Sequence, residues 1–295
     1  MFCGMSFYQI CAYFFIYSFV GWVVEVAFHA VSLGKVVNRG FLNGPVCPVY
    51  GFGMLAVLSI AHFIPLNDAG QINTGLLFLT GVVFTTLVEL FAGWILDKAF
   101  HARWWDYSEV PLNLNGYICL KFSIIWGLAV LLAVKVFHPF IENHFVSIFP
   151  QKLGWILLII FFLLLFVDLG ITIVIVAGLN KNLKKIDDLQ KALRKPSDKM
   201  SEIIAGGTLK VSTSVEEAKI QAALGKAELK DSIEEKKGQL EEYKREKEKQ
   251  IAELISNKKW GTRRLLRAFP KMKHSKYSET LQEVKLYFQS LKKKV

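Results

Sequence analysis

The first 180 residues of this chain carry very little charge, with only 7 Lys and Arg and 8 Asp and Glu side chains. About a quarter of the residues of a soluble globular domain are charged, so this composition excludes a single domain of that kind. The last 115 residues hold 29 basic and 17 acidic side chains, which supply nearly all of the net charge of +11. Because this basic part follows an apolar part, a cytoplasmic tail accounts for it, and we do not expect the chain to bind nucleic acid.

Cysteine pairs and nucleotide-binding loops are also lacking. The four cysteines contain no C-x-x-C pair, and Cys11 lies within an apolar run. This pattern argues against a disulfide framework and against a zinc site. No segment has the G-x-x-x-x-G-K-[ST] pattern that binds nucleotide phosphates. We therefore expect no cofactor and no metal, and any ATP-driven activity would require a separate ATP-binding subunit.

What the chain does contain is long apolar segments. A membrane-crossing helix needs about 20 mostly apolar residues, because ~1.5 Å per residue must cover ~30 Å of hydrocarbon. Five segments meet this length, at residues 8–33, 46–64, 75–96, 116–137 and 153–179. The first lacks a basic stretch before it and a cleavage site after it, so we interpret it as a retained helix and not as a signal peptide. The sequence predicts an all-α polytopic membrane helix bundle over residues 1–180.

Basic residues in the short loops predict the orientation of this bundle. Lys35 and Arg39 follow the first span, and Lys98 and Arg103 follow the third, whereas the loop after the second span has no basic residue. Loops rich in Lys and Arg face the cytoplasm. We therefore expect a multi-pass protein of the cell membrane, with its N-terminus outside and its C-terminus in the cytoplasm.

The membrane half partly matches itself when it is shifted by 72 residues. Residues 27–47 then show 8 identities in 21 positions, including 27–30 on 99–102 and Cys47 on Cys119. A gapped alternative places Glu25 on Glu89 in place of Asp97. Two hairpins of the same direction would form a parallel repeat, an arrangement in which transporter sites lie at the repeat interface. The alternative is that the hairpins share only an Asn-Gly turn before a helix.

Four ionisable residues stand out inside the predicted spans, where a charge costs at least ~2.5–3.5 kcal/mol near the bilayer centre. They are Glu25, Glu89, Lys121 and Asp168. At ~1.5 Å per residue, both glutamates lie about 10–12 Å inside the cytoplasmic boundary, and Lys121 lies roughly 7–8 Å inside it. We expect Glu25 and Glu89 to act in function, and the matching depths permit an ion pair between a glutamate and Lys121. The alternative is that these groups only neutralise each other, stay protonated or reach the interface.

The two cytoplasmic loops are dense in polar groups. In loop 34–45, the planar guanidinium of Arg39 suits a phosphate or a carboxylate. Asn43 and Asn115 are equally well explained as caps of the spans that follow them. Tryptophans in loop 101–116 are typical of interfacial anchors, and Asp106 between them calls for a partner such as Arg39 or Arg103. The site that we predict at the inner membrane face contains Glu25, Asn38, Arg39, Asn43, Tyr50, Glu89, Trp104, Trp105, Asp106, Tyr107, Asn113, Asn115 and Lys121.

The same positions carry a family resemblance. The runs at 38–45 and 48–51, with Gly21-Trp22 and Glu25, resemble the first half of the bacterial membrane family known as putative ABC-transporter type IV (CmpB-like). Glu89, Gly93, the run 104–108, Asn113, Gly116 and Cys119 resemble its second half. The resemblance covers about residues 5–140 and implies a permease subunit of an ABC transporter.

The charged part predicts a helical cytoplasmic tail. Residues 181–214 contain Pro196, Gly206 and Gly207 and are interpreted as a linker, followed by a basic helical tail over 215–295. Apolar residues at 229, 233, 240, 243 and 254 fit a sparse seven-residue repeat, so a coiled coil and a single polar helix both stay open. Basic residues beside a membrane can bind anionic lipid at ~1 kcal/mol per charge, or be a solvated face.

Three functions fit this sequence. The first is a transporter component with a polar site open to the cytoplasm. The second is a membrane enzyme acting on a lipid-linked or phosphorylated substrate, for which His101, Asp106 and the two glutamates are acid–base candidates. The third is a membrane scaffold whose tail recruits a partner. Candidate partners are the lipid bilayer, an ATP-binding subunit and a second copy of this chain.

Overall fold

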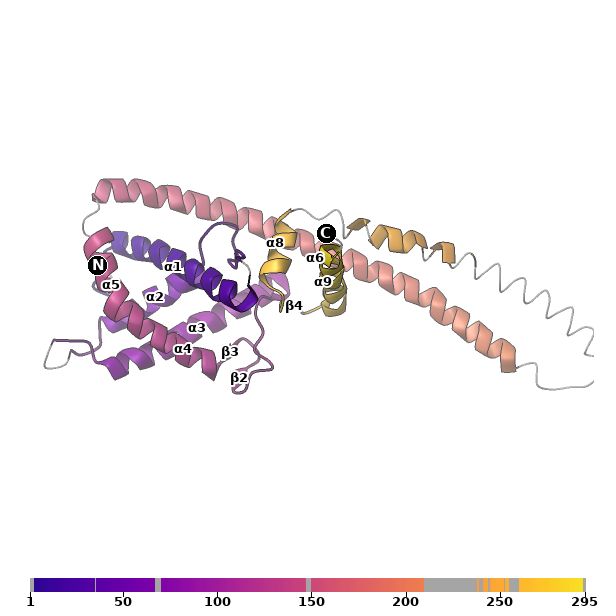
Figure 1. Ribbon diagram of the computed structural model, residues 1–295, viewed down its shortest axis with the longest axis horizontal. Coiled ribbons are helices and arrows are strands. Elements are labelled where there is room, and N and C mark those ends of the chain that lie inside the picture. Colours follow the sequence, from indigo (N-terminus) through magenta and orange to yellow (C-terminus); the bar gives the residue numbers. More distant parts are fainter. Residues whose placement is uncertain are drawn as a thin grey trace, which may run out of the picture. The chain divides into compact units, whose positions relative to one another are not determined.

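The computed structural model describes residues 3–34, 36–66, 70–146, 150–209, 238, 241–243, 245–251, 253–254 and 260–293. The chain divides into two compact units, the first being Met1–Gly178 with Lys259–Ser278 and the second Leu179–Lys258 with Glu279–Val295. The first unit therefore combines the apolar half with a short segment from near the C-terminus. Figure 1 follows the chain through both units.

The apolar half of the first unit is helical. Its helices are α1 (Phe7–Leu33), α2 (Pro48–Ala61), α3 (Thr74–Phe100) and α4 (Leu120–Leu132). The winding that begins in α4 continues through a π-helical turn at Ala133–Phe137, α5 (His138–Ile141) and a second π-helical turn at Glu142–Val146. The long helix α6 (Gln151–Leu209) begins in the first unit and continues into the second.

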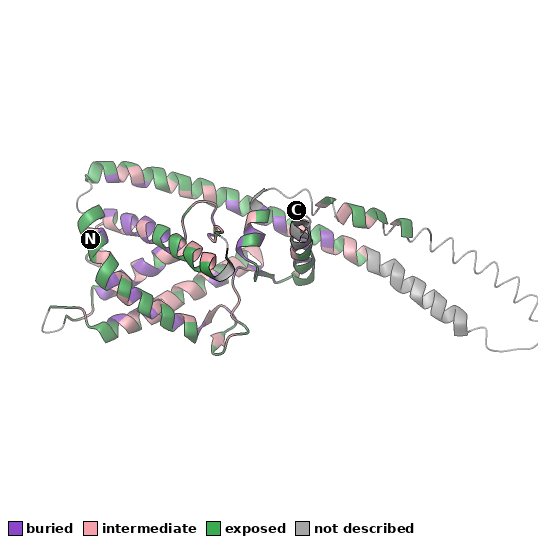
Figure 2. Ribbon diagram, in the orientation of Figure 1, coloured by how far each residue is buried: buried purple, intermediate pink, exposed green. Residues whose placement is uncertain are grey.

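Four of these helices are long and apolar enough to cross a membrane. They cover Phe7–Val31, Thr74–Phe100, Leu120–Val146 and Gln151–Ala192. Large apolar side chains on α3, α4 and α6 are exposed (green in Figure 2), which fits lipid contact. The predicted span at 46–64 is helical only over the 14 residues of α2, which cover about 21 Å. The polytopic helix bundle is therefore confirmed, with four helices of membrane length and one shorter apolar helix.

Neighbouring helices pack in chain order, α1 on α2, α2 on α3 and α3 on α4 (Figure 1). The N-terminal part of α6 lies on α1, where Phe15 packs edge-on against Phe162 at 4.8 Å between ring centroids. Tyr13, Val57 and Leu77 are among the most buried side chains of the core that results. This core holds the polar residues of α1, α2 and α3 in fixed positions.

The α1–α2 contact is close because glycine occupies it. A Cβ atom on Gly51 would overlap Ser18 Oγ and lie 2.6 Å from the carbonyl oxygen of Phe14. We expect Gly51→Ala to force the helices apart and to lower the free energy of unfolding by about 1–3 kcal/mol, as overpacking does. Thermal unfolding in detergent measures this. Gly53→Ala in the same helix is the control, since its Cβ would meet no atom within 4 Å; equal unfolding temperatures for both variants would contradict the prediction.

Short strands complete the loop end of the first unit. β2 (Asn113–Leu114) pairs with β3 (Ile118–Cys119) in a tight hairpin. β1 (Ala102–Arg103) pairs antiparallel with β4 (Lys273–His274), which follows the amphipathic helix α8 (Trp260–Ala268). A segment near the C-terminus is therefore joined by backbone pairing to the loop after α3.

In the second unit, α6 continues beyond Leu179, and α9 (Ser278–Lys293) supplies the other main helix. Leu183, Ile186, Leu281 and Val284 are buried. The linker predicted over 181–214 is helical as far as Leu209. The segment 215–255, for which a coiled coil and a single polar helix both stay open, lies mostly outside the described residues, and the domain boundaries stay a prediction.

Candidate functional site

A carboxylate of α1 has three polar neighbours at the loop end of the bundle. Tyr50 of α2 donates a 2.7 Å hydrogen bond to Glu25 Oε1. Arg39 Nε lies 3.7 Å from Glu25 Oε2, and His29 Nδ1 lies 3.5 Å from the same oxygen. Gly21 makes this arrangement possible, because a Cβ atom there would overlap the Tyr50 ring. Glu25 is therefore a carboxyl group held between α1, α2 and loop 34–45.

A second carboxylate, on α3, has fewer partners. Tyr107 donates a 3.0 Å hydrogen bond to Glu89 Oε1, and the indole of Trp126 of α4 is a second, less well aligned donor toward the same carboxylate. Glu89 Oε2 is buried and makes no hydrogen bond of ordinary geometry with a described residue. A buried acceptor without a donor costs about 1–3 kcal/mol. This oxygen is one of several unsatisfied polar atoms of the site, together with Arg39 Nε, Asn43 Oδ1 and Trp104 Nε1.

The two carboxylates belong to one electrostatic cluster. Glu25 and Glu89 interact with each other, and Arg39 interacts with Glu25, Tyr50 and Tyr107. Burial lowers the pKa of Arg39, while Glu25 opposes this effect. Burial and Glu89 raise the pKa of Tyr107, so its hydroxyl stays a donor. The cluster thus contains two carboxyl groups and one guanidinium group.

Loop 34–45 is fixed by side chains from two helices. Asn38 Oδ1 accepts hydrogen bonds from Trp22 Nε1 at 2.8 Å and from the Gly40 amide at 3.0 Å. Asp168 of α6 accepts from the backbone amides of Asn43 at 3.0 Å and Gly44 at 2.7 Å. Its Oδ1 also accepts from Asn43 Nδ2 at 2.8 Å. Asp168 therefore anchors the loop that carries Arg39.

Loop 101–119 is held together by its own polar side chains. Asn113 Oδ1 accepts from the Gly116 amide at 3.0 Å, and its Nδ2 donates to the Val110 carbonyl at 2.7 Å. Trp105 Nε1 donates to the Tyr117 carbonyl at 2.9 Å. These bonds fix the hairpin of β2 and β3 and thereby place Tyr107 against Glu89.

The segment 260–278, which we call the C-terminal clasp, contacts both loops. Arg264 donates from Nη1 to the Gly40 carbonyl at 2.9 Å and from Nη2 to the Phe41 carbonyl at 3.0 Å. Arg39 Nη1 donates in return to the Ala268 carbonyl at 2.6 Å. Phe269 packs edge-on against Trp104, with 5.0 Å between ring centroids. The clasp is thus bonded directly to Arg39, a residue of the predicted site.

The clasp is equally bonded to the second loop. Lys273 Nζ lies 2.6 Å from Asp106 Oδ2, and Ser275 Oγ donates to Asp97 Oδ1 at 2.7 Å. The Ser275 amide donates to the His101 carbonyl at 2.8 Å. Partial burial disfavours the ionised form of Asp106, but hydrogen bonds from Lys273 and Ser108 outweigh it and lower its pKa. The clasp therefore joins the corresponding loops of the two hairpins.

Acid is expected to loosen the clasp through His274, which is buried. The Nδ1 atom of its ring accepts hydrogen bonds from the amides of Lys276 and Tyr277, both at 3.1 Å. Burial, with His101 and Lys276, lowers the pKa of His274 to about 4. The undocked ring titrates near its ordinary value of ~6.5, so docking is at full strength above that pH and is lost as pH falls toward 4. From pH 7 to pH 5, we expect exchange of the Ser275 amide to rise about 20-fold beyond its intrinsic change.

Hydrogen exchange of the full-length protein in detergent, read by mass spectrometry, measures this step, the rise in Ser275 amide exchange between pH 7 and pH 5. His274→Gln removes the titrating ring and is expected to remove the step. The exposed His144 offers the matched control, since His144→Gln is expected to keep it. A step of the same size in the His274→Gln protein would contradict the prediction.

Several sequence-based assignments require correction. Lys121 is exposed and forms no ion pair with the part of the chain that the structure describes, so it does not pair with a glutamate. Cys47 and Cys119, not Asn43 and Asn115, occupy the N-cap positions of α2 and α4. Asn115 instead has a left-handed backbone, with φ of 50°, and lies in a turn. The partner of Asp106 is Lys273, not Arg39 or Arg103, and Trp104 is buried between Phe41 and Phe269.

The structure also supplies residues that the sequence did not indicate. Arg264, Phe269, Lys273 and His274 lie in the charged tail, where basic residues are common and no pattern marks these four. Asp168 was visible as an isolated charge in an apolar helix, but nothing in the sequence shows that it meets loop 34–45. The two aligned cysteines of the 72-residue shift do occupy matching helix starts, which supports the repeat.

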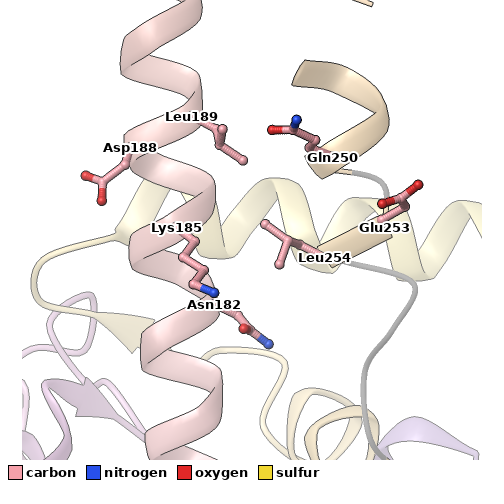
Figure 3. A pocket seen from close by; sticks show the side chains of 7 residues that line it. All are labelled: Asn182, Lys185, Asp188, Leu189, Gln250, Glu253 and Leu254. Carbon is pink, nitrogen blue, oxygen red and sulfur yellow. The ribbon is translucent and has the colours of Figure 1, made fainter. Parts of the chain in front are cut away.

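A hollow of about 660 Å³ lies in the second unit and contains none of the predicted site residues. Its lining includes Lys185, Gln250 and Leu254, and Figure 3 shows Asp188 turned away from the latter two. The described residues contain no group of three or more His, Cys, Asp or Glu side chains that could hold a metal ion. The polar cluster of the first unit is therefore the better candidate site.

Comparison with known proteins agrees with the resemblance in the sequence. The family described as putative ABC-transporter type IV matches residues 12–173, which is more than half of the chain. Searches of curated proteins and of solved structures gave no significant match. The matched range contains α1 to α4, both polar loops and the anchoring Asp168. This chain is a membrane protein and belongs to the putative ABC-transporter type IV family.

Proposed function

We propose that this protein is a permease-like component of a transporter, with a polar solute site between loops 34–45 and 101–116. The buried Oε2 of Glu89, which makes no hydrogen bond of ordinary geometry with the described residues, is the observation that supports this most strongly. It lies beside Tyr107 and in the same cluster as Glu25 and Arg39. An ionisable residue buried at membrane depth is a candidate functional residue, because its burial is costly.

The donor and acceptor balance suggests the class of solute. Glu25 is already satisfied by Tyr50 and Arg39, whereas Glu89 offers an oxygen that needs a donor. A solute with a protonated amine would supply both the missing hydrogen bond and the missing positive charge. Of the donors that an anionic head group would need, Arg39 Nη1 bonds Ala268 and Arg264 Nη1 bonds Gly40, while Nε of both arginines makes no hydrogen bond with a described residue.

The cell context follows from the same proposal. We place the N-terminus outside and both polar loops in the cytoplasm, so that the C-terminal clasp meets them on that side. A separate ATP-binding subunit would supply energy. The apolar bundle over 1–180 would be the transport domain, joined by 181–214 to the basic tail over 215–295.

Binding of a labelled diamine to the full-length protein tests the site. We expect Glu89→Gln to weaken putrescine binding about 10- to 100-fold, which corresponds to one charged hydrogen bond of about 1.5–3 kcal/mol. Equilibrium dialysis of the protein in detergent measures this, and uptake into membrane vesicles is expected to fall in parallel. Glu25→Gln is expected to abolish uptake while the protein still inserts.

Glu109→Gln is the matched control, because Glu109 is exposed in the same loop as Tyr107. Its binding and uptake should equal those of the wild type. Equal putrescine binding by the Glu89→Gln and wild-type proteins, or preferential binding of glycerol phosphate, would reject the amine site. Normal uptake in the Glu25→Gln protein would reject the transport role.

A further inference from the structure

Helix α1 carries a polar or small residue at every fourth position across its length. Residues four apart form a continuous ridge on a helix, inclined to its axis. From the first to the last member the ridge covers 20 residues, which is about 30 Å and equals the thickness of the hydrocarbon core. Its members are Gln9, Tyr13, Tyr17, Gly21, Glu25 and His29.

At the N-terminal end of α1, this ridge meets a second titratable pair. Gln9 Nε2 donates to Glu142 Oε1 at 3.1 Å, and Tyr13 donates to the other oxygen of the same carboxylate. One turn along, the Tyr17 hydroxyl is 3.0 Å from His138 Nδ1. Tyr13 also packs edge-on against the His138 ring, with 4.9 Å between centroids. Glu142, Tyr13, His138 and Tyr17 therefore follow one another along the helix.

The backbone around Glu142 and His138 departs from regular α-helix. Two π-helical turns, Ala133–Phe137 and Glu142–Val146, flank the four residues His138–Ile141. Pro139 has no amide to donate and its ring would clash with the preceding turn of an α-helix, which accounts for the wider winding. Such π-helical turns occur frequently at functional sites.

Beyond Tyr17, the ridge turns toward α2 and reaches the cluster of Glu25. Ser18 Oγ is buried next to Gly51 and has no hydrogen-bond partner among the described residues. Tyr50 then packs on Gly21 and bonds Glu25, which interacts with His29. Protonatable groups thus lie at both ends of the ridge, from Glu142 to Tyr17 and from Tyr50 to His29, with Ser18 and Gly21 between the two groups.

We propose that this ridge conducts protons across the bundle, with Glu142 and His138 at one end and Glu25 and His29 at the other. Tyr13 and Tyr17 are only 2% and 4% exposed, so the ridge is too tightly packed for a solute. A hydroxyl can accept one proton and release its own, and an imidazole can do the same through its two nitrogens. One proton enters and one leaves, and an applied pH gradient or voltage drives the transfer.

Proton flux into liposomes that contain the full-length protein tests this proposal. A potassium diffusion potential set with valinomycin drives protons, and an entrapped pH dye reports them. We expect the wild-type rate to exceed that of protein-free liposomes, and Glu142→Gln to lower the protein-dependent rate at least ~10-fold, since each protonatable group is required in series. Tyr17→Phe removes one hydroxyl, keeps the ring in the core, and is expected to have a similar effect.

His144→Gln and Glu109→Gln are the controls, because both residues are exposed and titratable but lie off the ridge. They should conduct protons as the wild type does. Equal rates for Tyr17→Phe and wild type, or a wild-type rate equal to that of empty liposomes, would overturn the proposal. The proposed solute site shares Glu25 with the ridge but uses neither Glu142 nor Tyr17. Loss of putrescine binding in Glu89→Gln together with unchanged proton flux in Tyr17→Phe would therefore leave the solute site standing and reject the proton path.

Discussion

Asp168→Ala is expected to release loop 34–45 from α6. The carboxylate accepts from the amides of Asn43 and Gly44 and from Asn43 Nδ2, all within 3.0 Å. An alanine would leave these donors without their acceptor, at about 1–3 kcal/mol for each group that stays buried. We expect a loss of about 3–5 kcal/mol in local stability and a rise of at least ~100-fold in exchange of the two amides. Hydrogen exchange of the loop peptide measures the effect.

Thr172→Val is the matched control for this prediction. Thr172 lies one turn after Asp168, accepts a hydrogen bond from Asn43 Nδ2 at 3.1 Å and donates a longer one to Asp168 Oδ1 at 3.4 Å. Its loss is expected to cost about 0.5–1.5 kcal/mol and to change amide exchange less than ~15-fold. If the amides of Asn43 and Gly44 stayed protected in the Asp168→Ala protein, Asp168 would not be the anchor of the loop.

Asp168 could be recognised in the sequence as an unusual charge, but its partner could not. A single carboxylate in an apolar helix is conspicuous because of its desolvation cost, so its presence calls for a partner. Its partners include two backbone amides of a loop more than 120 residues away. Every residue except proline has such an amide, so the sequence does not show which amides bind the carboxylate. Glu25 and Arg39 were easier to identify as site residues, since both are charged and both lie in or beside the first predicted span.

The sequence predicted part of the fold, just as it predicted part of the candidate site. The length of the apolar runs identified the four membrane-length helices, because this length can be counted directly in the sequence. It overestimated α2, where Pro48 suits a helix start and the chain turns after Ala61 although Phe63 and Ile64 are still apolar. The ridge on α1 could have been found from its four-residue spacing, but tyrosine in an apolar helix is ordinarily an interfacial or core residue.

The C-terminal clasp was not predictable, because its specificity comes from geometry and not from composition. Arg263 and Arg264 are adjacent and chemically identical, yet Arg263 is exposed and Arg264 bonds two carbonyls of loop 34–45. A helix directs neighbouring side chains about 100° apart, so only one of the two can face the loop. Their positive charge is the same and therefore does not show which of the two arginines bonds the loop.

Arg264→Ala is accordingly expected to detach the clasp, whereas Arg263→Ala should not. Two hydrogen bonds from a charged donor contribute about 1.5–3 kcal/mol each, so we expect a loss of about 3–5 kcal/mol in docking. This predicts that exchange of the Ser275 amide, which bonds the His101 carbonyl, rises about 150- to 4,000-fold. Both variants lose one positive charge, so a difference between them cannot come from net charge. Equal Ser275 protection in the two variants would contradict the role of Arg264, and the Tyr107 amide, which bonds the Gly116 carbonyl within its own loop, should stay protected in both.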